Sequence, residues 1–338
     1  MTGPIAPIVD IGGWADGDAA TRARIAADLD AAARATGFLQ LVGHGIPDAL
    51  RAAALDAMDR FFRRPDEAKA RCVPADPALY RGWSGRKSES FAYSIGDASP
   101  ADLVEAFLMG ADDVGGTTPA HAPNVWPDDV DGFRDAIWGW YVAARGVART
   151  LAEIAASAIG MDPAVLAEAL DAPVVTMRAN WYERRADDPA LTDDQLALGA
   201  HTDYGIITVL LADEVPGLEV LAPDGTWVGL VPSPGTLVVN ISDALSVWTN
   251  DVWRSSIHRV VPSMEPGGAA RRSIALFLDG NEATPLAPLD TFVTEDRPSR
   301  YHPTTLGEHV LDKINAGRYG VLPVAAEQTL QGRLQTST

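Results

Sequence analysis

Cysteine is nearly absent from this sequence of 338 residues, in which Cys72 is the single example. One cysteine excludes a disulfide within the chain and any metal site made of several thiolates. A lone free thiol is typical of a reducing compartment, and we therefore expect a cytoplasmic protein.

Long apolar segments are also absent. The sequence contains no run of eighteen apolar residues, so we expect no transmembrane helix and no membrane partner. Residues 1–18 lack the basic segment and the apolar segment of a secretory signal, and we therefore expect no such signal.

Basic residues are scarce relative to acidic ones. The sequence has 27 lysines and arginines against 46 aspartates and glutamates, which gives a formal net charge of −19. A protein this acidic repels polyanions, so we expect no nucleic-acid partner. A cationic substrate is compatible with the charge, although a solubilising acidic surface is the simpler explanation. The sequence gives no indication of an oligomeric state.

Helical and strand-like patterns occupy different parts of the chain. Apolar residues recur at helical spacing in residues 19–36, and further helices are expected at 48–64, 131–159 and 304–317. From Val174 onward, short apolar segments alternate with turns, which is typical of a β-sandwich or barrel. The expected strands are residues 38–42, 174–182, 206–211, 218–221, 226–230, 236–241, 256–261 and 273–278.

The predicted fold is therefore α+β and rich in strands. We predict an N-terminal α/β region at residues 1–125, in which the irregular stretch from residue 73 onward is a candidate substrate lid. Residues 126–338 are expected to form one compact unit that contains the long helix, the β-core and a C-terminal helix.

Two of the six histidines lie in strand-like segments, one of them beside a carboxylate. His201 and Asp203 are two positions apart, and side chains at this spacing on a strand point to the same side. A barrel can bring His258 next to them. Two histidines and one carboxylate that hold one face of a metal ion are typical of non-haem Fe(II) oxygenases. Zn²⁺ can use the same ligands, and a single His-x-Asp also arises by chance.

An ordered series of motifs extends this pattern over most of the chain. Together they resemble the Fe(II)- and 2-oxoglutarate-dependent dioxygenases, in the branch of isopenicillin N synthase. The resemblance implies a double-stranded β-helix, or cupin-like jelly roll, with Fe(II) held by His201, Asp203 and His258. The motifs are Pro4–Asp10, Gly37–Pro47, Asn180–Tyr182, Leu198–Gly205, Pro216–Val220, Trp227–Val228, Pro234–Asn240, Asp243–Asn250, His258–Val261 and Arg271–Ile274.

The resemblance also implies how the cosubstrate is held. In this family an Arg-x-Ser motif binds the distal carboxylate of 2-oxoglutarate, which assigns Arg271 and Ser273 to that role. A guanidinium pairs with a carboxylate through two hydrogen bonds, and a hydroxyl adds another. Strand alternation turns the neighbouring Arg272 away from the site. Tyr182 and Asn180 are expected to help hold the cosubstrate.

The candidates for a substrate pocket are mainly aromatic, and each has an alternative role in the core or in a salt bridge. His44, in the Gly-His-Gly turn, is expected to be structural. The pocket candidates are Tyr204, Phe277, Arg178, Trp248, Phe107 and Trp83, with Phe91 and Arg81 also in the expected lid.

The implied reaction consumes O₂ and 2-oxoglutarate and releases succinate and CO₂. It oxidises an unactivated C–H bond of a small molecule by hydroxylation, desaturation or cyclisation, and no catalytic acid or base from the protein is expected. Three alternatives stay open: an Fe(II) oxidase of the isopenicillin N synthase type without 2-oxoglutarate, a Zn²⁺ hydrolase or lyase, and a non-catalytic small-molecule-binding protein. A role in secondary metabolism is suggested by the acidic, alanine-rich composition, which is typical of a high-GC bacterium.

Overall fold

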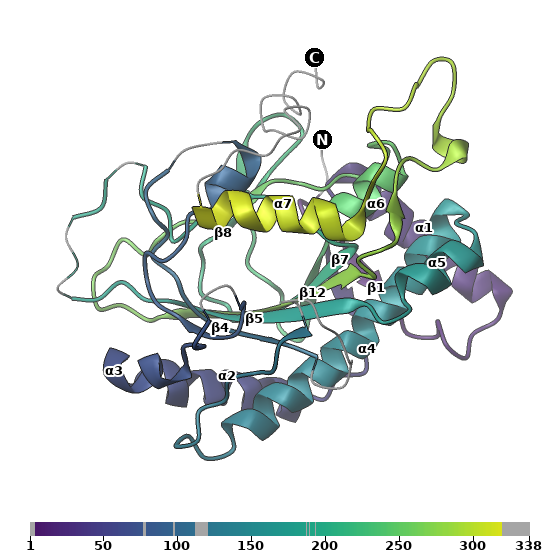
Figure 1. Cartoon of the computed structure of the whole chain (residues 1–338). Coiled ribbons are helices and arrows are strands. Elements are labelled where there is room, and N and C mark those ends of the chain that lie inside the picture. The colour runs from purple at the N-terminus through teal and green to yellow at the C-terminus, as the bar shows by residue number, and fades with distance from the viewer. Residues whose placement is uncertain are drawn as a thin grey trace.

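The structure is a computed structural model that describes residues 4–319, apart from 77–78, 97–98, 112–120, 187, 189 and 193. Figure 1 shows a central sheet with helices packed against it. None of the helices in the described residues combines the length and apolar character that crossing a bilayer requires.

The larger sheet runs through the middle of the molecule (Figure 1). Its described strands follow the order β1-β2-β10-β7-β12-β5-β4-β3. The β1–β2 pair is parallel, and the other neighbours are antiparallel. The strands are β1 (Ile8–Asp10), β2 (Phe38–Val42), β3 (Gly82–Ser84), β4 (Glu105–Gly110), β5 (Val174–Tyr182), β7 (Ile207–Ala212), β10 (Leu237–Ile241) and β12 (Arg271–Gly280).

A smaller antiparallel sheet faces the larger one. Its order is β6-β11-β8-β9, formed by Leu198–His201, His258–Val260, Leu218–Leu221 and Trp227–Gly229. Phe38 and Val238 of the larger sheet pack with Leu218 and Val220 of the smaller one in a single apolar cluster. The two sheets therefore enclose an interior between them, and the predicted α+β fold with a jelly-roll core is confirmed.

Helices cover the outer face of the larger sheet because that face is apolar. Along β12, Ile274, Leu276 and Leu278 point outward into the main core, while the residues between them point to the interior. Figure 1 shows α2 and α4 beneath this face. The helices are α1 (Ala19–Ala35), α2 (Asp48–Phe62), α3 (Asp66–Lys69), α4 (Phe133–Ile159), α5 (Pro163–Ala169), α6 (Asp243–Trp248) and α7 (Leu306–Tyr319).

The helix α4 supplies much of this core. It buries Trp140, Tyr141 and Leu151, among others, on one side, and each fully buried side chain of this size contributes roughly 1.5–3 kcal/mol of stability. The helix ends at Gly160, whose φ of 64° is the left-handed conformation that glycine adopts most easily.

A second group of elements lies on the other side of the larger sheet (Figure 1). The 3₁₀ helix η2 (Phe91–Ile95) packs against both β6 and α7. Gly199 on β6 makes this close approach possible, because an added Cβ would lie 2.8 Å from the backbone nitrogen of Ala92. The segment around η2 therefore covers the interior next to β6. Short additional elements are η1 (Ala70–Cys72), η4 (Asp290–Phe292), β13 (Pro285–Leu286) and β14 (Thr304–Thr305).

The expected helices and most expected strands match the structure, but the stretch from residue 73 onward is less irregular than predicted. It contains β3 and β4, and every residue of β4 is buried. The apolar run in β4 is too short to reveal a period among the surrounding prolines and glycines. Strands from both sides of residue 125 share the larger sheet, and the division of the chain at that point stays a prediction.

Candidate metal centre and its surroundings

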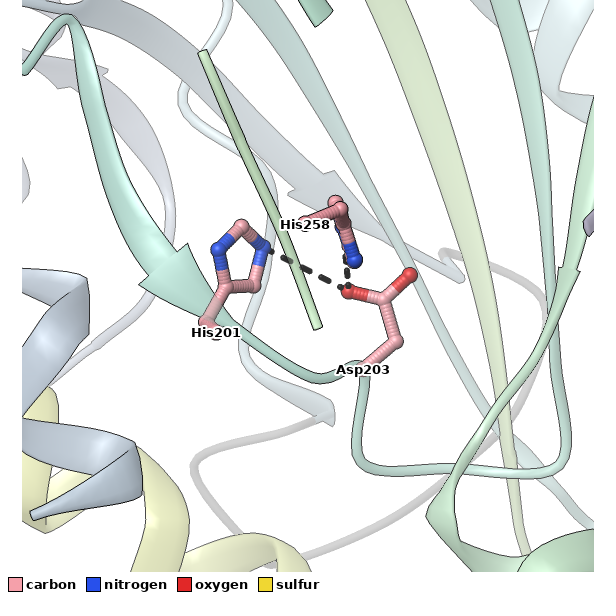
Figure 2. Close-up of side chains that lie close together, drawn as sticks. All are labelled: His201, Asp203 and His258. Atoms are coloured by element: carbon pink, nitrogen blue, oxygen red, sulfur yellow. Dashed lines mark ion pairs between the residues drawn. The ribbon is translucent and has the colours of Figure 1, made fainter. Parts of the chain in front are cut away.

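The three predicted metal ligands meet in the interior between the two sheets. His201 ends β6, Asp203 follows it in a turn, and His258 begins β11, where it is paired directly with His201. Asp203 Oδ1 lies 3.6 Å from His201 Nε2 and 3.7 Å from His258 Nε2. Figure 2 shows both imidazoles facing the carboxylate. Within the described residues, this trio offers ligand atoms that all lie within 4.8 Å of one another.

Backbone carbonyls orient both imidazoles. His201 Nδ1 lies 2.7 Å from the carbonyl oxygen of Gly199, and His258 Nδ1 lies 3.2 Å from that of Ser256. A carbonyl only accepts, so we assign the proton of each ring to Nδ1. Each Nε2 then presents a lone pair toward Asp203 Oδ1, which is the tautomer that a metal requires.

The carboxylate of Asp203 is held by an amide that the sequence analysis missed. Asn240 on β10 donates from Nδ2 to Asp203 Oδ2 over 2.7 Å, and Oδ1 is left to face the two histidines. Asn240 is the last residue of the motif Pro234–Asn240, and its place in that motif was the signal that could have identified it. Phe38, which packs edge-on against His258 with ring centroids 5.3 Å apart, was missed as well.

All three side chains of the trio are buried. The exposed fractions are 5% for His201, 5% for Asp203 and 8% for His258. Burial, and next the neighbouring His258, lower the pKa of His201 well below its ordinary value. The imidazole is therefore neutral near pH 7, as a metal ligand must be. Three buried polar groups without a strong donor among them are suited to a cation.

The turn that carries Asp203 is held by Asp243, a fully buried residue. Asp243, at the start of α6, donates its N–H to the carbonyl oxygen of Asp203 over 2.9 Å. Its carboxylate accepts from Ser255 at 2.6 Å and Thr202 at 3.2 Å, and it faces His309 Nε2 of α7 at 3.2 Å. Sequence reasoning gave neither Asp243 nor His309 a role.

The four predicted cosubstrate residues share the interior face of neighbouring strands. Arg271 on β12 is paired with Tyr182 on β5, and Ser273 is paired with Asn180. The guanidinium of Arg271 lies 5.1 Å above the Tyr182 ring, and its Nη1 is buried without a hydrogen-bond partner in the described residues. Burial raises the pKa of the Tyr182 phenol, while Arg271 and Ser273 act to lower it. A buried guanidinium with an unused donor is suited to an anion.

Arg272 points the other way, as strand alternation predicts. It forms ion pairs with Asp59 of α2 at 2.8 Å and with Asp213 at 3.1 Å on the helix-covered side. Arg271 and Arg272 are therefore neighbours in sequence with separate surroundings.

Arg178 also reaches the interior, where it is already paired. Its Nη1 lies 2.8 Å from Oε2 of Glu89, and both side chains are nearly buried. Its Nε donates to Asn180 Oδ1 over 2.7 Å, which leaves the amide nitrogen of Asn180 free to donate. Phe91 packs between Arg178 and His201, 5.0 Å from the guanidinium and 5.1 Å from the imidazole. Glu89 lies in a loop without a recognisable motif, so the sequence gave no signal for it.

Three of the pocket candidates are corrected by the structure, because they pack in the core. Phe107 contacts Phe61 and Phe133 on the helix-covered face of β4. Trp83 is paired with Phe107 and donates to Glu105, on that same face. Trp248 is fully buried, and its indole nitrogen donates to the carbonyl oxygen of Pro285. Spacing alone could not assign these aromatic side chains to a face.

Two other candidates are not part of the helix-covered core. Phe277 is partly exposed and is paired with Thr176 and Thr208 on the interior face of the larger sheet. Tyr204 directly follows Asp203, and burial raises the pKa of its phenol, which therefore stays neutral. Of these two residues and Phe91, Phe91 has the ring that contacts the trio, 5.1 Å from the imidazole of His201.

Two family profiles match the chain. One, described as non-haem dioxygenase in morphine synthesis N-terminal, matches residues 6–129. The other, described as the 2OG-Fe(II) oxygenase superfamily, matches residues 174–280, which include the trio and the Arg-x-Ser motif.

Characterised proteins and solved structures are similar to this chain over most of their length. A 2-oxoglutarate-Fe(II) type oxidoreductase, hxnY, of Emericella nidulans is 31% identical and covers 90% of this chain and 88% of its own. Validamycin A dioxygenase of Streptomyces hygroscopicus subsp. limoneus is 32% identical over 86% of this chain and 80% of its own. The crystal structure of a full-length Neurospora crassa protein in complex with alpha-KG and thymine has a TM-score of 0.79 at 26% identity, over 92% of this chain and 96% of that one.

Proposed function

Because the chain belongs to the Fe(II)- and 2-oxoglutarate-dependent oxygenases, we propose that His201, Asp203 and His258 bind the iron of this enzyme. The convergence of two Nε2 atoms and one carboxylate oxygen supports this assignment. The donor set fits Fe(II), which takes two histidines and one carboxylate on one face and keeps its other positions open.

The cosubstrate assignment follows from the unused donor of Arg271. We propose that Arg271 and Ser273 bind the distal carboxylate of 2-oxoglutarate, and that Tyr182 and Asn180 complete the site. The orphaned Nη1 of Arg271 is the observation that carries this proposal, since a buried charged donor is normally paired. When bound, Fe(II) and 2-oxoglutarate supply the oxidising power for C–H oxidation with O₂. The protein positions both and excludes water from them.

The substrate is a small molecule, and its pathway is a further proposal. Relatives include validamycin A dioxygenase and, at 31% identity, flavanone 3-dioxygenase 2 of Oryza sativa subsp. japonica. These names support a role in secondary metabolism, as the composition suggested. The cytoplasmic location stays a prediction from the single cysteine, Cys72.

An anaerobic titration with 2-oxoglutarate tests the proposal. The Fe(II)-loaded protein is expected to develop a visible charge-transfer band as the keto acid chelates the iron. The intensity of this band should saturate as the 2-oxoglutarate concentration rises. In Arg271→Leu, removal of the charged pair is expected to weaken 2-oxoglutarate binding about 10- to 100-fold while Fe(II) affinity stays unchanged. Arg272→Leu is the matched control, and its 2-oxoglutarate affinity should equal that of the wild type.

The contrary results are distinct. Fe(II) binding without a band, together with O₂ consumption without succinate, would favour an oxidase that uses no 2-oxoglutarate. Unaltered iron affinity in a His201→Ala, Asp203→Ala or His258→Ala variant would contradict the ligand assignment.

A further inference from the structure

Asp279 places a second carboxylate in the interior, outside the metal ligands and the cosubstrate residues. It lies near the end of β12, two residues after Phe277, where the register shifts between Leu278 and Gly280. Its Oδ2 accepts from Thr176 Oγ1 at 3.4 Å. Because Thr176 is paired with Phe277 on the interior face, this bond fixes the carboxylate on the same side as the metal centre.

Gly205 sets the position of this carboxylate relative to the iron ligands. A Cβ added at Gly205 would lie 2.4 Å from Asp279 Oδ1 and 2.5 Å from Asp279 Cα, so both the carboxylate and the backbone of Asp279 lie against Gly205. Gly205 is two residues after Asp203, in the same turn. Asp279 therefore lies beside that turn. Two aromatic residues are close in sequence: Phe277 is two positions before Asp279, and Tyr204 directly precedes Gly205.

Asp279 has weaker hydrogen bonding than two other acids of this region, Asp102 and Glu89. Asp102 accepts backbone N–H groups from Phe91 and Gly199, at 2.9 and 2.8 Å. Glu89 is paired with Arg178. Asp279 is 9% exposed, and the long bond from Thr176 is its only hydrogen bond with the described residues. One long hydrogen bond leaves most of the acceptor capacity of the Asp279 carboxylate available to a further donor.

Burial accounts for the electrostatic state of Asp279. Desolvation, with a smaller contribution from Asp203, raises the pKa of its carboxyl to about 7. In the part of the chain that the structure describes, no cation is among the groups that shift this pKa, and the Thr176 hydroxyl alone lowers it. A bound group that donates hydrogen bonds or carries positive charge would relieve this cost.

We infer that Asp279 is a specificity-determining residue that receives a hydrogen-bond donor of the substrate, preferably the ammonium group of an amine. The inference rests on the proposed function of the neighbouring trio as the metal centre. It names the substrate class as small amines with an apolar or aromatic body, which Phe277, Phe91 and Tyr204 are suited to contact. The formal net charge of −19 favours the approach of such cations.

Three probes with one phenyl ring and different head groups test the inference. Benzylammonium, benzyl alcohol and benzoate are titrated by calorimetry, under argon, into protein loaded with Fe(II) and 2-oxoglutarate. We expect binding to decrease in that order in the wild type. Asp279→Asn is expected to lose about 10- to 100-fold in benzylammonium affinity, since a hydrogen bond to a charged partner is lost, and to gain affinity for benzoate. Asp16→Asn, an exposed acid with the same charge change, is the matched control and should leave all three affinities unchanged.

Thr176→Val separates recognition from a structural role. It removes the single hydroxyl bonded to Asp279 and keeps the carboxylate, so the preference for benzylammonium is expected to persist. If Asp279 serves only to bond Thr176, both variants would lower the melting temperature alike and neither would alter the order of the probes.

The inference is overturned by equal affinity for the three probes in the wild type, by undetectable binding of benzylammonium, or by an Asp279→Asn variant that retains wild-type preference. The wild-type order and Thr176→Val test it even where Asp279→Asn does not fold. The charge-transfer band reports separately on iron and 2-oxoglutarate, so failure of the proposed function is visible apart from failure of this inference.

Discussion

The hydrogen bond from Asn240 to Asp203 leads to a quantitative prediction about metal affinity. Asn240 is 4% exposed, and its amide donates to a carboxylate oxygen over 2.7 Å. A hydrogen bond to a charged group contributes about 1.5–3 kcal/mol, and loss of a group that orients a metal ligand typically costs about 10- to 100-fold in affinity. The two ranges agree, because a factor of ten corresponds to about 1.4 kcal/mol. We therefore expect Asn240→Leu to weaken Fe(II) binding about 10- to 100-fold.

The assay is anaerobic competition for Fe(II) between the protein and a chelator of known affinity. Thr208→Val is the matched control, because Thr208 is paired with Asn240 on the neighbouring strand and its hydroxyl contacts Ser242, 3.4 Å away, rather than the trio. Its iron affinity should stay within about threefold of the wild type. Asn240→Leu with wild-type iron affinity and an unchanged melting temperature would refute the reasoning, since Asp203 would then need no partner to hold its orientation.

Two further predictions concern stability. Arg272→Ala removes the pairs with Asp59 and Asp213, so we expect a loss of about 1–3 kcal/mol in denaturant unfolding with no change in 2-oxoglutarate affinity; an altered cosubstrate affinity would contradict its outward placement. Burial raises the pKa of Asp102 to about 7, so the folded state binds more protons than the unfolded state between about pH 4 and 7. Its contribution to the free energy of unfolding is therefore full below this window and is lost as the pH rises through it, by at most about 1.4 kcal/mol per pH unit. Asp279, whose pKa is also raised to about 7, adds to the same slope, so Asp102→Asn should reduce the slope measured from pH 5 to 8, and an unchanged slope would exclude Asp102 as a source.

Local spacing was enough to predict the features that depend on strand alternation. The two-residue step from Arg271 to Ser273 places both side chains toward the interior. Asp203 lies in the turn after β6, so strand alternation does not fix its side chain, although it does meet His201. The same rule sends Arg272 outward to Asp59. These predictions need only the period of the strand and its register. The meeting of His258 with His201 required the fold that the family resemblance implied.

Strand spacing could not predict the contacts of residues in irregular segments, or choose between alternative roles for aromatic residues. Glu89 contacts Arg178 from a loop 89 positions away, and no local pattern specifies that approach. Phe107 and Phe277 are both aromatic residues on strands, yet one packs against the helices and the other faces the interior. The register between strands decides on which face of the sheet each of these side chains lies, and the sequence alone does not determine that register.

The charges of the interior connect the proposed iron site with the inference about Asp279. Fe(II) brings two positive charges and Asp203 one negative charge, while 2-oxoglutarate brings two negative charges and Arg271 one positive charge, so these four sum to zero. The Arg178–Glu89 pair also sums to zero. With iron and cosubstrate bound as proposed, none of these positive charges is left to compensate Asp279. In an interior of low dielectric constant such a charge is costly, and a cationic substrate that enters beside it removes the cost. The same arrangement would disfavour a carboxylate substrate, so discrimination between amines and acids follows from one residue.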